Sequence, residues 1–435
     1  MEKVLRLALK SAEAAELFRT HEVSTPVRFE ANRLKTAQTR EGTTYALRVL
    51  VDGRLGFATA TSLADASALV DMAVETAQFG DRARLVFPEK TEDKAVPIYD
   101  PAVEAVSLQD MVGLGQGVID AMRRDESDLV CEAWVGKGNV EVEVINSSGL
   151  HASYRKSFFG LSAEGTLVRG TDMLFVGDSE SSCRPITDSG PITQIILEQL
   201  ENARNTAPAP QGEVPVVFTP LGVANVLLMP LSMGLNGRNV VQGTSPLAEQ
   251  QGKESFHPSF YLRDDPTIPY SPASRPWDDE GTPSQVTTLV EGGKVTGFLY
   301  DILTAAKAGI RSTGNGMRMY GGPPSPAPTA WVVGAGTVPY EQMIADIDDG
   351  LIVEEVIGAG MGNVLGGDFA GNVLLGYRVQ RGKIMGRVKD TVVSGNAYQV
   401  LKSILAVSKE TRWVGGRLLT PALCCGKVSV STGQA

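Results

Sequence analysis

Tyr45-Ala-Leu-Arg-Val-Leu-Val51, then Asp52-Gly53, then Arg54-Leu-Gly-Phe-Ala-Thr-Ala60 is the stretch that decides the class of fold. The larger apolar side chains recur at every second position of its first run, which is typical of a β-strand with one buried face. Asp-Gly readily adopts the positive φ angles of a tight turn, so the stretch predicts a β-hairpin. Such a hairpin joins antiparallel strands and indicates an antiparallel sheet.

Segments with helical spacing flank the hairpin. Residues 3–18 carry apolar side chains at three-and-four spacing and predict an amphipathic helix. Ser62 begins a second predicted helix, with Asp65 as capping partner, that continues to Phe79. A helix from Ser107 and another over 191–205 follow. The helix from Ser107 is expected to bury Leu108, Met111, Val112, Val118, Ile119 and Met122.

The rest of the chain adds strands rather than alternating β-α-β units. Short apolar runs broken by glycine over 129–176 predict an antiparallel meander, and Gly292-Gly293 marks a second hairpin within 286–300. Glycine-punctuated strands are expected over 351–388. Buried helices are expected over 221–235, through Leu227, Leu228 and Leu231, and over 397–407.

These elements define an α+β protein of two domains. The first, residues 1–206, combines helices with an antiparallel or mixed sheet. Residues 207–215 form a proline-rich linker, because their prolines can neither continue a helix nor enter a central strand. Residues 216–435 form a glycine-rich antiparallel sheet, barrel-like, with helices. Each domain is expected to have a separate core.

Composition narrows the possible partners and the compartment. Apolar residues make up 43% and charged residues 21%, as in soluble folded proteins. The formal charge of −10 disfavours direct binding of nucleic acid. No window is long and apolar enough to span a membrane, and residues 1–20 lack the pattern of a secretion signal. We therefore expect a cytoplasmic protein that does not bind membranes.

The chain lacks the motifs of several kinds of catalytic and nucleotide-binding site. No Gly-Lys pair is followed by Ser or Thr, which excludes a Walker loop, and no G-x-S-x-G elbow occurs. Gly358-Ala-Gly360-Met-Gly362 misses the spacing of a dinucleotide turn, so these glycines more simply serve tight backbone turns. The histidines and cysteines of the chain are not spaced like the ligands of a metal site. Cys424 and Cys425 are expected to be buried or partner-facing thiols.

The acidic run Asp278-Asp279-Glu280 leaves two interpretations open. Together with Asp264-Asp265, it could supply carboxylates for a metal or for acid-base catalysis. Alternatively, these carboxylates cap turns and remain solvated, which is the commoner use of such residues.

A series of short motifs in the second half resembles the TldD/PmbA family, whose members include putative modulators of DNA gyrase. The motifs occur in the order of the family and are Leu235-Asn-Gly-Arg-Asn-Val-Val-Gln-Gly-Thr-Ser245, Asp264-Asp-Pro266, Trp277-Asp-Asp-Glu-Gly281, Ser312-Thr-Gly-Asn315, Gly366-Gly-Asp-Phe369 and Ser394-Gly-Asn396. Each motif alone resembles an ordinary turn. Their shared order makes the resemblance specific, and it implies a cytosolic peptidase system of two related subunits.

The resemblance implies that a TldD-type subunit holds zinc through an HExxxH helix and a later cysteine. At the matching place this chain reads Val226-Leu-Leu-Met-Pro-Leu-Ser-Met233, and the glycine-rich stretch Gly358–Gly376 has no cysteine. Three protein ligands and an open position are what a hydrolytic zinc requires. The chain therefore resembles the PmbA-type subunit, also called TldE, with no metal or cofactor of its own and zinc in the partner.

The resemblance further implies that the protein works in proteolysis and peptide processing. We expect a non-catalytic subunit that pairs with a zinc-bearing TldD-type subunit and handles unfolded or leader-bearing peptides. The alternative is a homodimeric peptide-binding or regulatory protein without hydrolytic activity. Any effect on DNA gyrase would be indirect. No catalytic residue is expected, and the candidates for peptide or partner binding are Asp279, Glu280, Gly281, Ser312, Thr313, Asn315, Gly366, Gly367 and Asp368.

Overall fold

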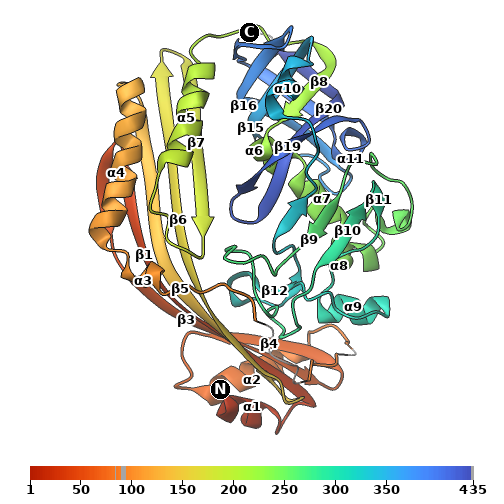
Figure 1. Cartoon of the computed structure of the whole chain (residues 1–435). Coiled ribbons are helices and arrows are strands. Elements are labelled where there is room, and N and C mark those ends of the chain that lie inside the picture. The colour runs from red at the N-terminus through yellow and green to blue at the C-terminus, as the bar shows by residue number, and fades with distance from the viewer. Residues whose placement is uncertain (84, 90–94, 433–435) are drawn as a thin grey trace.

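The computed structural model describes residues 1–83, 85–89 and 95–432 and has two large sheets (Figure 1). A seven-stranded sheet belongs to the first half of the chain, and an eleven-stranded sheet belongs to the second. Helices pack against both sheets, which confirms the α+β class. Within the described residues, no helix is both long enough and apolar enough to cross a membrane.

The first sheet is antiparallel throughout and has the order β4-β3-β1-β5-β6-β7, with β2 beside β1. The predicted hairpin is confirmed, because Asp52 and Gly53 have φ angles of 49° and 69° and join β3 to β4. The meander over 129–176 is also confirmed, with longer strands than expected. The strands are β1 (Ala14–Glu30), β2 (Arg33–Ala37), β3 (Arg40–Val51), β4 (Arg54–Ala60), β5 (Val130–Asn146), β6 (His151–Arg169) and β7 (Asp172–Ser182).

Helices cover this sheet at two levels (Figure 1). They are α1 (Glu2–Ala8), α2 (Ala66–Ala77), α3 (Ala102–Ala105), α4 (Leu108–Asp125) and α5 (Gly190–Asn202). Ser107 and Asp110 form a complete capping box at the start of α4. Leu108, however, is 48% exposed, because the first residue of this helix lies outside its buried face.

Two helix predictions in this half need correction. The helix predicted over 3–18 ends at Ala8, and residues 14–18 instead extend β1 because they pair with β3. The helix predicted from Ser62 begins at Ala66. Its cap is Asp65, whose carboxylate accepts a hydrogen bond from the Ala68 amide at 2.9 Å.

The second sheet contains a closed barrel, which confirms the barrel-like expectation. Strands β8, β15, β16, β18 and β20 form a ring, because β20 pairs with β8 as well as with β18. The strands are β8 (Gly212–Phe218), β9 (Leu262–Asp264), β10 (Thr287–Glu291), β11 (Lys294–Val295), β14 (Trp331–Val333), β15 (Asp349–Ile357), β16 (Asp368–Gln380), β17 (Lys383–Arg387), β18 (Thr391–Asn396), β19 (Ile404–Val414) and β20 (Leu418–Thr432). A small separate pair is formed by β12 (Gly316–Met317) and β13 (Ser325–Pro326).

Short helices surround the second sheet. They are α6 (Pro220–Val226), α7 (Leu228–Gly234), α8 (Gly237–Val241), η1 (Ala248–Gln250), α9 (Ile302–Ala308), η2 (Met319–Gly321), α10 (Tyr340–Ala345) and α11 (Ala397–Val400). The helix predicted over 221–235 is thus two helices, α6 and α7. Pro230 cannot donate to the Val226 carbonyl, which accounts for the break between them. The helix predicted over 397–407 ends at Val400, because residues from Ile404 pair with β20.

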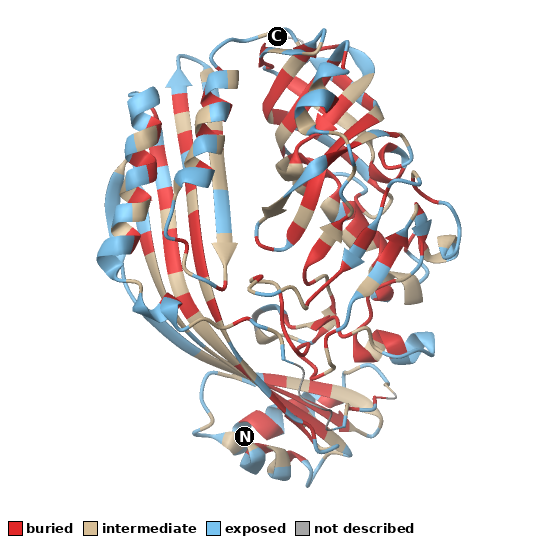
Figure 2. Cartoon of the chain, in the orientation of Figure 1, coloured by how far each residue is buried: buried red, intermediate tan, exposed pale blue. Residues whose placement is uncertain are grey.

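Buried residues occur along the strands of both sheets (Figure 2). The two halves share one buried cluster, contrary to the expectation of separate cores. One buried apolar cluster contains Phe159 and Ile196 from the first half together with Val217, Ile352 and Tyr377 from the second. Strand β8 starts at Gly212, inside the stretch predicted as a linker, and includes Pro215. The domain limits themselves stay a prediction.

Candidate functional site

The acidic run is buried, so its expected solvation is wrong. Asp278 and Glu280 are 0% exposed and Asp279 is 9% exposed. The Asp278 carboxylate accepts hydrogen bonds from the amides of Glu280, Thr282 and Gly316 at 3.0, 2.8 and 2.8 Å. The run therefore closes a tight loop and ties it to β12.

Glu280 belongs to a buried ionic network that joins the two halves of the chain. Arg48 on β3 donates to Glu280 at 2.7 Å and to Glu16 on β1 at 2.8 Å. Arg318, which follows β12, donates to the other oxygen of Glu16. With two cations and two carboxylates, the network is neutral. Burial of these charges is tolerable because each one has a partner of opposite sign.

Burial shifts the titration of these groups. Burial raises the pKa of Glu16, and the charges of Arg48 and Arg318 offset part of that rise. Desolvation disfavours the charged form of Arg48, but Glu16 and Glu280 more than compensate and raise its pKa. Burial, together with the nearby charge of Glu280, raises the pKa of Asp278. Perturbed groups often mark functional sites, although structural ion-pair networks produce the same shifts.

The structure brings together two groups of the predicted site residues, residues 279–281 and residues 312–315. Asp279 pairs with Arg275 at 3.1 Å and accepts from the Arg318 amide at 2.7 Å. On the neighbouring segment, Asn315 donates to Asp264 at 2.7 Å and accepts from the Thr313 hydroxyl at 2.7 Å. Ser312 donates to the Tyr300 carbonyl at 3.0 Å. These side chains are occupied in holding loops against one another.

Gly281 has a steric role in the same loop. Its φ angle is +76°, and a Cβ atom there would lie 2.1 Å from Cδ2 of Leu150. Leu150 belongs to a buried cluster with strands of the first sheet and with Trp277. Glycine at this position therefore lets the loop approach the first sheet.

The third predicted group, Gly366, Gly367 and Asp368, lies elsewhere, beside α7. Asn396 donates to the Gly366 carbonyl at 2.8 Å and to Asp368 at 2.9 Å. The Tyr398 hydroxyl is 3.0 Å from the carbonyl oxygens of both Leu365 and Pro230. Pro230 is part of α7, so this group is packed against the helix that matches the expected zinc motif. Among the described residues, no hydrogen bond connects it directly with the acidic loop.

Helix α7 presents thioethers where the zinc-bearing subunit is expected to present metal ligands. Met229 is 54% exposed, rather than packed in the core, and its sulfur lies 3.2 Å from the place of a Cβ at Gly360. Met361 in the facing loop is 87% exposed. In the described part of the chain, no three His, Cys, Asp or Glu side chains come together in a way that could hold a metal ion. Cys424 and Cys425 are buried, as one of the two interpretations expected.

A cavity of about 230 Å³ separates the two sheets at their edges. Strand β7 is the last strand of its sheet. Among the described strands, β19 pairs with β20, and an isolated bridge joins its Ser408 to Val338. The cavity is lined by Asp178 and Ser179 of β7 and by Arg412 and Trp413 of β19. Asp178 and Arg412 form an ion pair across it. No motif in the sequence predicts this site, because edge strands are defined by tertiary pairing.

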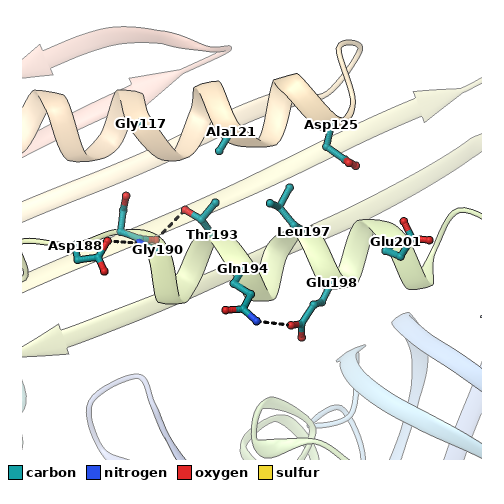
Figure 3. A pocket seen from close by; sticks show the side chains of 11 residues that line it. Gly117, Ala121, Asp125, Asp188, Gly190, Thr193, Gln194, Leu197, Glu198 and Glu201 are labelled. Atoms are coloured by element: carbon teal, nitrogen blue, oxygen red, sulfur yellow. Dashed lines mark hydrogen bonds between the residues drawn. The ribbon is translucent and has the colours of Figure 1, made fainter.

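A larger groove of about 650 Å³ lies between α4 and α5 (Figure 3). Gly117 and Ala121 of α4 face Thr193 and Leu197 of α5 across it. Arg204 forms ion pairs with Asp125 at 3.1 Å and with Glu201 at 2.7 Å at one end of the groove. None of the predicted site residues lines it.

Comparison with known proteins gives the family. Residues 211–432 match the C-terminal domain of the PmbA/TldA metallopeptidases, and residues 15–77 match domain 1 of the same proteins. The first match alone spans more than half of the chain. The chain therefore belongs to the PmbA/TldD family of metalloprotease homologues.

Individual relatives agree with this membership. An uncharacterized protein of Methanocaldococcus jannaschii is 24% identical over 97% of this chain and 98% of its own length. A metalloprotease TldD homologue of Haemophilus influenzae is 30% identical over 47% of this chain, and the match spans only 42% of that protein. The crystal structure of TldE from Thermococcus kodakarensis covers 100% of both chains with a TM-score of 0.90 and 24% identity, which shows the same fold.

Proposed function

We propose that the protein is the non-catalytic subunit of a TldD/TldE-type metallopeptidase that trims or degrades unfolded and leader-bearing peptides in the cytoplasm. The composition of α7 carries the proposal. Its residues Leu228–Gly234 include no histidine, cysteine or carboxylate. Hydrolytic zinc needs about three nitrogen, oxygen or sulfur ligands and an open position. The thioether of Met229 is a soft donor that suits copper(I) better than zinc.

In this proposal, a zinc-bearing TldD-type partner supplies the reactive water, and this chain helps to hold the substrate. The cavity between β7 and β19 supports that role. An extended peptide can add to an exposed strand edge through main-chain hydrogen bonds, which demand little of its sequence. Trp413 at the cavity wall offers an apolar contact.

Metal analysis and a cleavage assay test the proposal. Protein purified without chelator should contain no stoichiometric zinc and should not cleave an unfolded peptide. A mixture with a zinc-bearing TldD-type protein should cleave it more than the partner alone does. One zinc per chain with chelator-sensitive cleavage by this protein alone would contradict the proposal. An inert mixture with a competent partner would instead favour the homodimeric peptide-binding protein.

Fluorescence tests the peptide site separately. A short peptide of alternating valine and threonine, titrated into the protein, should change the emission of Trp413. The Trp413→Phe variant should lose that change while it still binds the peptide, and Trp134→Phe is the matched control. An unchanged titration in Trp413→Phe would place the peptide elsewhere.

A further inference from the structure

A second cavity, of about 340 Å³, lies where β3 and β4 face α8 and α9. Its volume is within the range of about 300–1,000 Å³ that is usual for sites of small ligands. Both halves of the chain build it, since Leu55 and Phe57 come from the first sheet and Arg238 and Lys307 from the helices of the second half. None of the site residues predicted from the sequence lines this cavity, although Arg238, Val241 and Gln242 belong to the family motif Leu235–Ser245.

The helical repeat of α8 and α9 places polar side chains of both helices at this cavity. Leu303, Thr304 and Lys307 on α9 are spaced three and four residues apart, so they share one face of the helix. Arg238 in α8 and Gln242 at its end are also four residues apart, and both line the cavity. The two helices therefore place hydrogen-bond donors on the same wall.

The Thr304 hydroxyl donates to Asp301 at 2.6 Å, but the two cations have few acceptors. Among the described residues, Lys307 has no hydrogen-bond or ion-pair partner, and Arg238 has only the Pro324 carbonyl at 3.4 Å for its guanidinium. Arg48 is 4% exposed and uses its terminal nitrogens for Glu16 and Glu280, but its buried Nε has no partner. Among the described lining residues, Asp81 carries the carboxylate. It forms no ion pair with Arg238 or Lys307.

We infer that this cavity binds the carboxylate group of a ligand. Two exposed cations and a buried unpaired Nε lie around one space, in a protein whose formal charge is −10. A carboxylate would accept charge-assisted hydrogen bonds from Arg238 and Lys307 together. The apolar wall formed by Leu55, Phe57 and Leu303 suits a short organic chain behind that carboxylate. The carboxylate can come from a free organic acid or from the C-terminus of a peptide.

Calorimetric titration of the full chain at low salt distinguishes these sources. The probes are succinate and a short acetylated peptide that ends in either a free carboxylate or an amide. We expect succinate, the free-acid peptide or both to bind, and the amidated peptide to bind more weakly. Binding of succinate alone assigns a free acid as the ligand, whereas binding of the free-acid peptide alone assigns a peptide terminus.

Variants locate the binding. Arg238→Gln and Lys307→Gln should each weaken it about tenfold, because each removes one charge-assisted hydrogen bond. Both side chains are exposed, so the fold should survive, and circular dichroism checks this. Lys402→Gln, an exposed lysine outside the cavity, is the matched control and should bind like the wild type. The inference would be overturned if neither succinate nor the free-acid peptide binds, if the amidated peptide binds as tightly as a free-acid peptide that does bind, or if both cavity variants keep the wild-type affinity.

Discussion

Arg318 is the residue whose loss should damage the fold most directly. Its guanidinium is 0% exposed and pairs with Glu16, which is also 0% exposed. Arg318→Met removes that charge and leaves the Glu16 carboxylate with Arg48 alone. We expect the free energy of unfolding to fall by about 3–5 kcal/mol, because the remaining buried charge is under-compensated. Urea unfolding of the variant and the wild type measures the difference.

A double variant provides the control for this prediction. Glu16→Gln combined with Arg318→Met removes both charges of the pair, so part of the lost stability should return. The free energies of unfolding of both single variants and the double variant complete the cycle. Strictly additive losses would mean that the ion pair itself has no coupling energy.

Lys156 should give the protein a measurable dependence on alkaline pH. Its ammonium donates to the carbonyls of Pro272 and Ser274 at 2.8 and 3.2 Å, and burial lowers its pKa from 10.5 to about 8. Between these two pH values the unfolded chain binds more protons than the folded one, so stability should rise with pH. That contribution is lost as pH falls through about 8.

The comparison with Lys156→Met isolates this group. Wild-type and variant proteins are unfolded with urea at several pH values across the window from about 8 to 10.5. The stability of the variant should rise less with pH than that of the wild type. Parallel curves would contradict the assignment to Lys156.

Substitution of Gly281 tests whether close steric packing holds the predicted site loop in place. Gly281→Ala combines a positive φ with a collision against Leu150, whereas Gly309→Ala has a φ of +69° and open space around its Cβ. Gly309→Ala should cost about 1–2 kcal/mol, from the backbone conformation alone. Gly281→Ala should cost about 1–3 kcal/mol more, from the forced repacking. Thermal unfolding compares the two, and equal losses would argue against the close packing of this loop.

At the level of single residues, the sequence motifs located part of the site. Family motifs led to Asp279, Glu280 and Asn315, which do lie together. They could not lead to Glu16 or Arg48, because Arg48 meets Glu280 across 232 positions of the chain. The solvated interpretation of the acidic run was wrong, since a run of carboxylates does not reveal the arginines that other segments bring to it.

Helix α7 shows how packing differs along one short element. Leu231 is 3% exposed and belongs to the main apolar cluster of the second half, while Leu228 is only partly buried against it. Leu231→Ala should therefore cost about 2–5 kcal/mol, and Leu228→Ala should cost less. Urea unfolding of the two variants checks the order. A larger loss at Leu228 would mean that the exposed side of α7 is covered in solution.

Elements with strong local signals were predicted well, and those decided by pairing were not. The Asp52-Gly53 hairpin and the Ser107 capping box are local, so their residues suffice. The helices expected over 3–18 and 397–407 end early because residues 14–18 pair with β3 and residues 404–407 pair with β20, both of which lie outside the predicted helices. The prediction of one continuous helix over 221–235 did not take into account that Pro230 has no backbone N–H to donate.

The whole molecule depends on contacts between its halves. A fragment of residues 216–435 would expose Val217, Ile352 and Tyr377, which pack against the first half in the shared cluster. It would also leave Arg318 and Glu280 without Glu16 and Arg48. We expect this fragment to be insoluble, or to lack a cooperative thermal transition that the full chain shows. A soluble fragment with cooperative unfolding would show that the halves are independent.

The ring of strands in the second half has a consequence for the order of events during synthesis. Strand β8 leaves the ribosome well before β20, yet Phe218 and Val216 pair with Leu423 and Cys425. The ring therefore cannot close until nearly all of the intervening chain has emerged, and such distant pairing is intrinsically slow. In that interval the apolar edge of β8 is open to wrong partners. A newly made chain should thus depend on chaperones or rapid capture until β20 arrives.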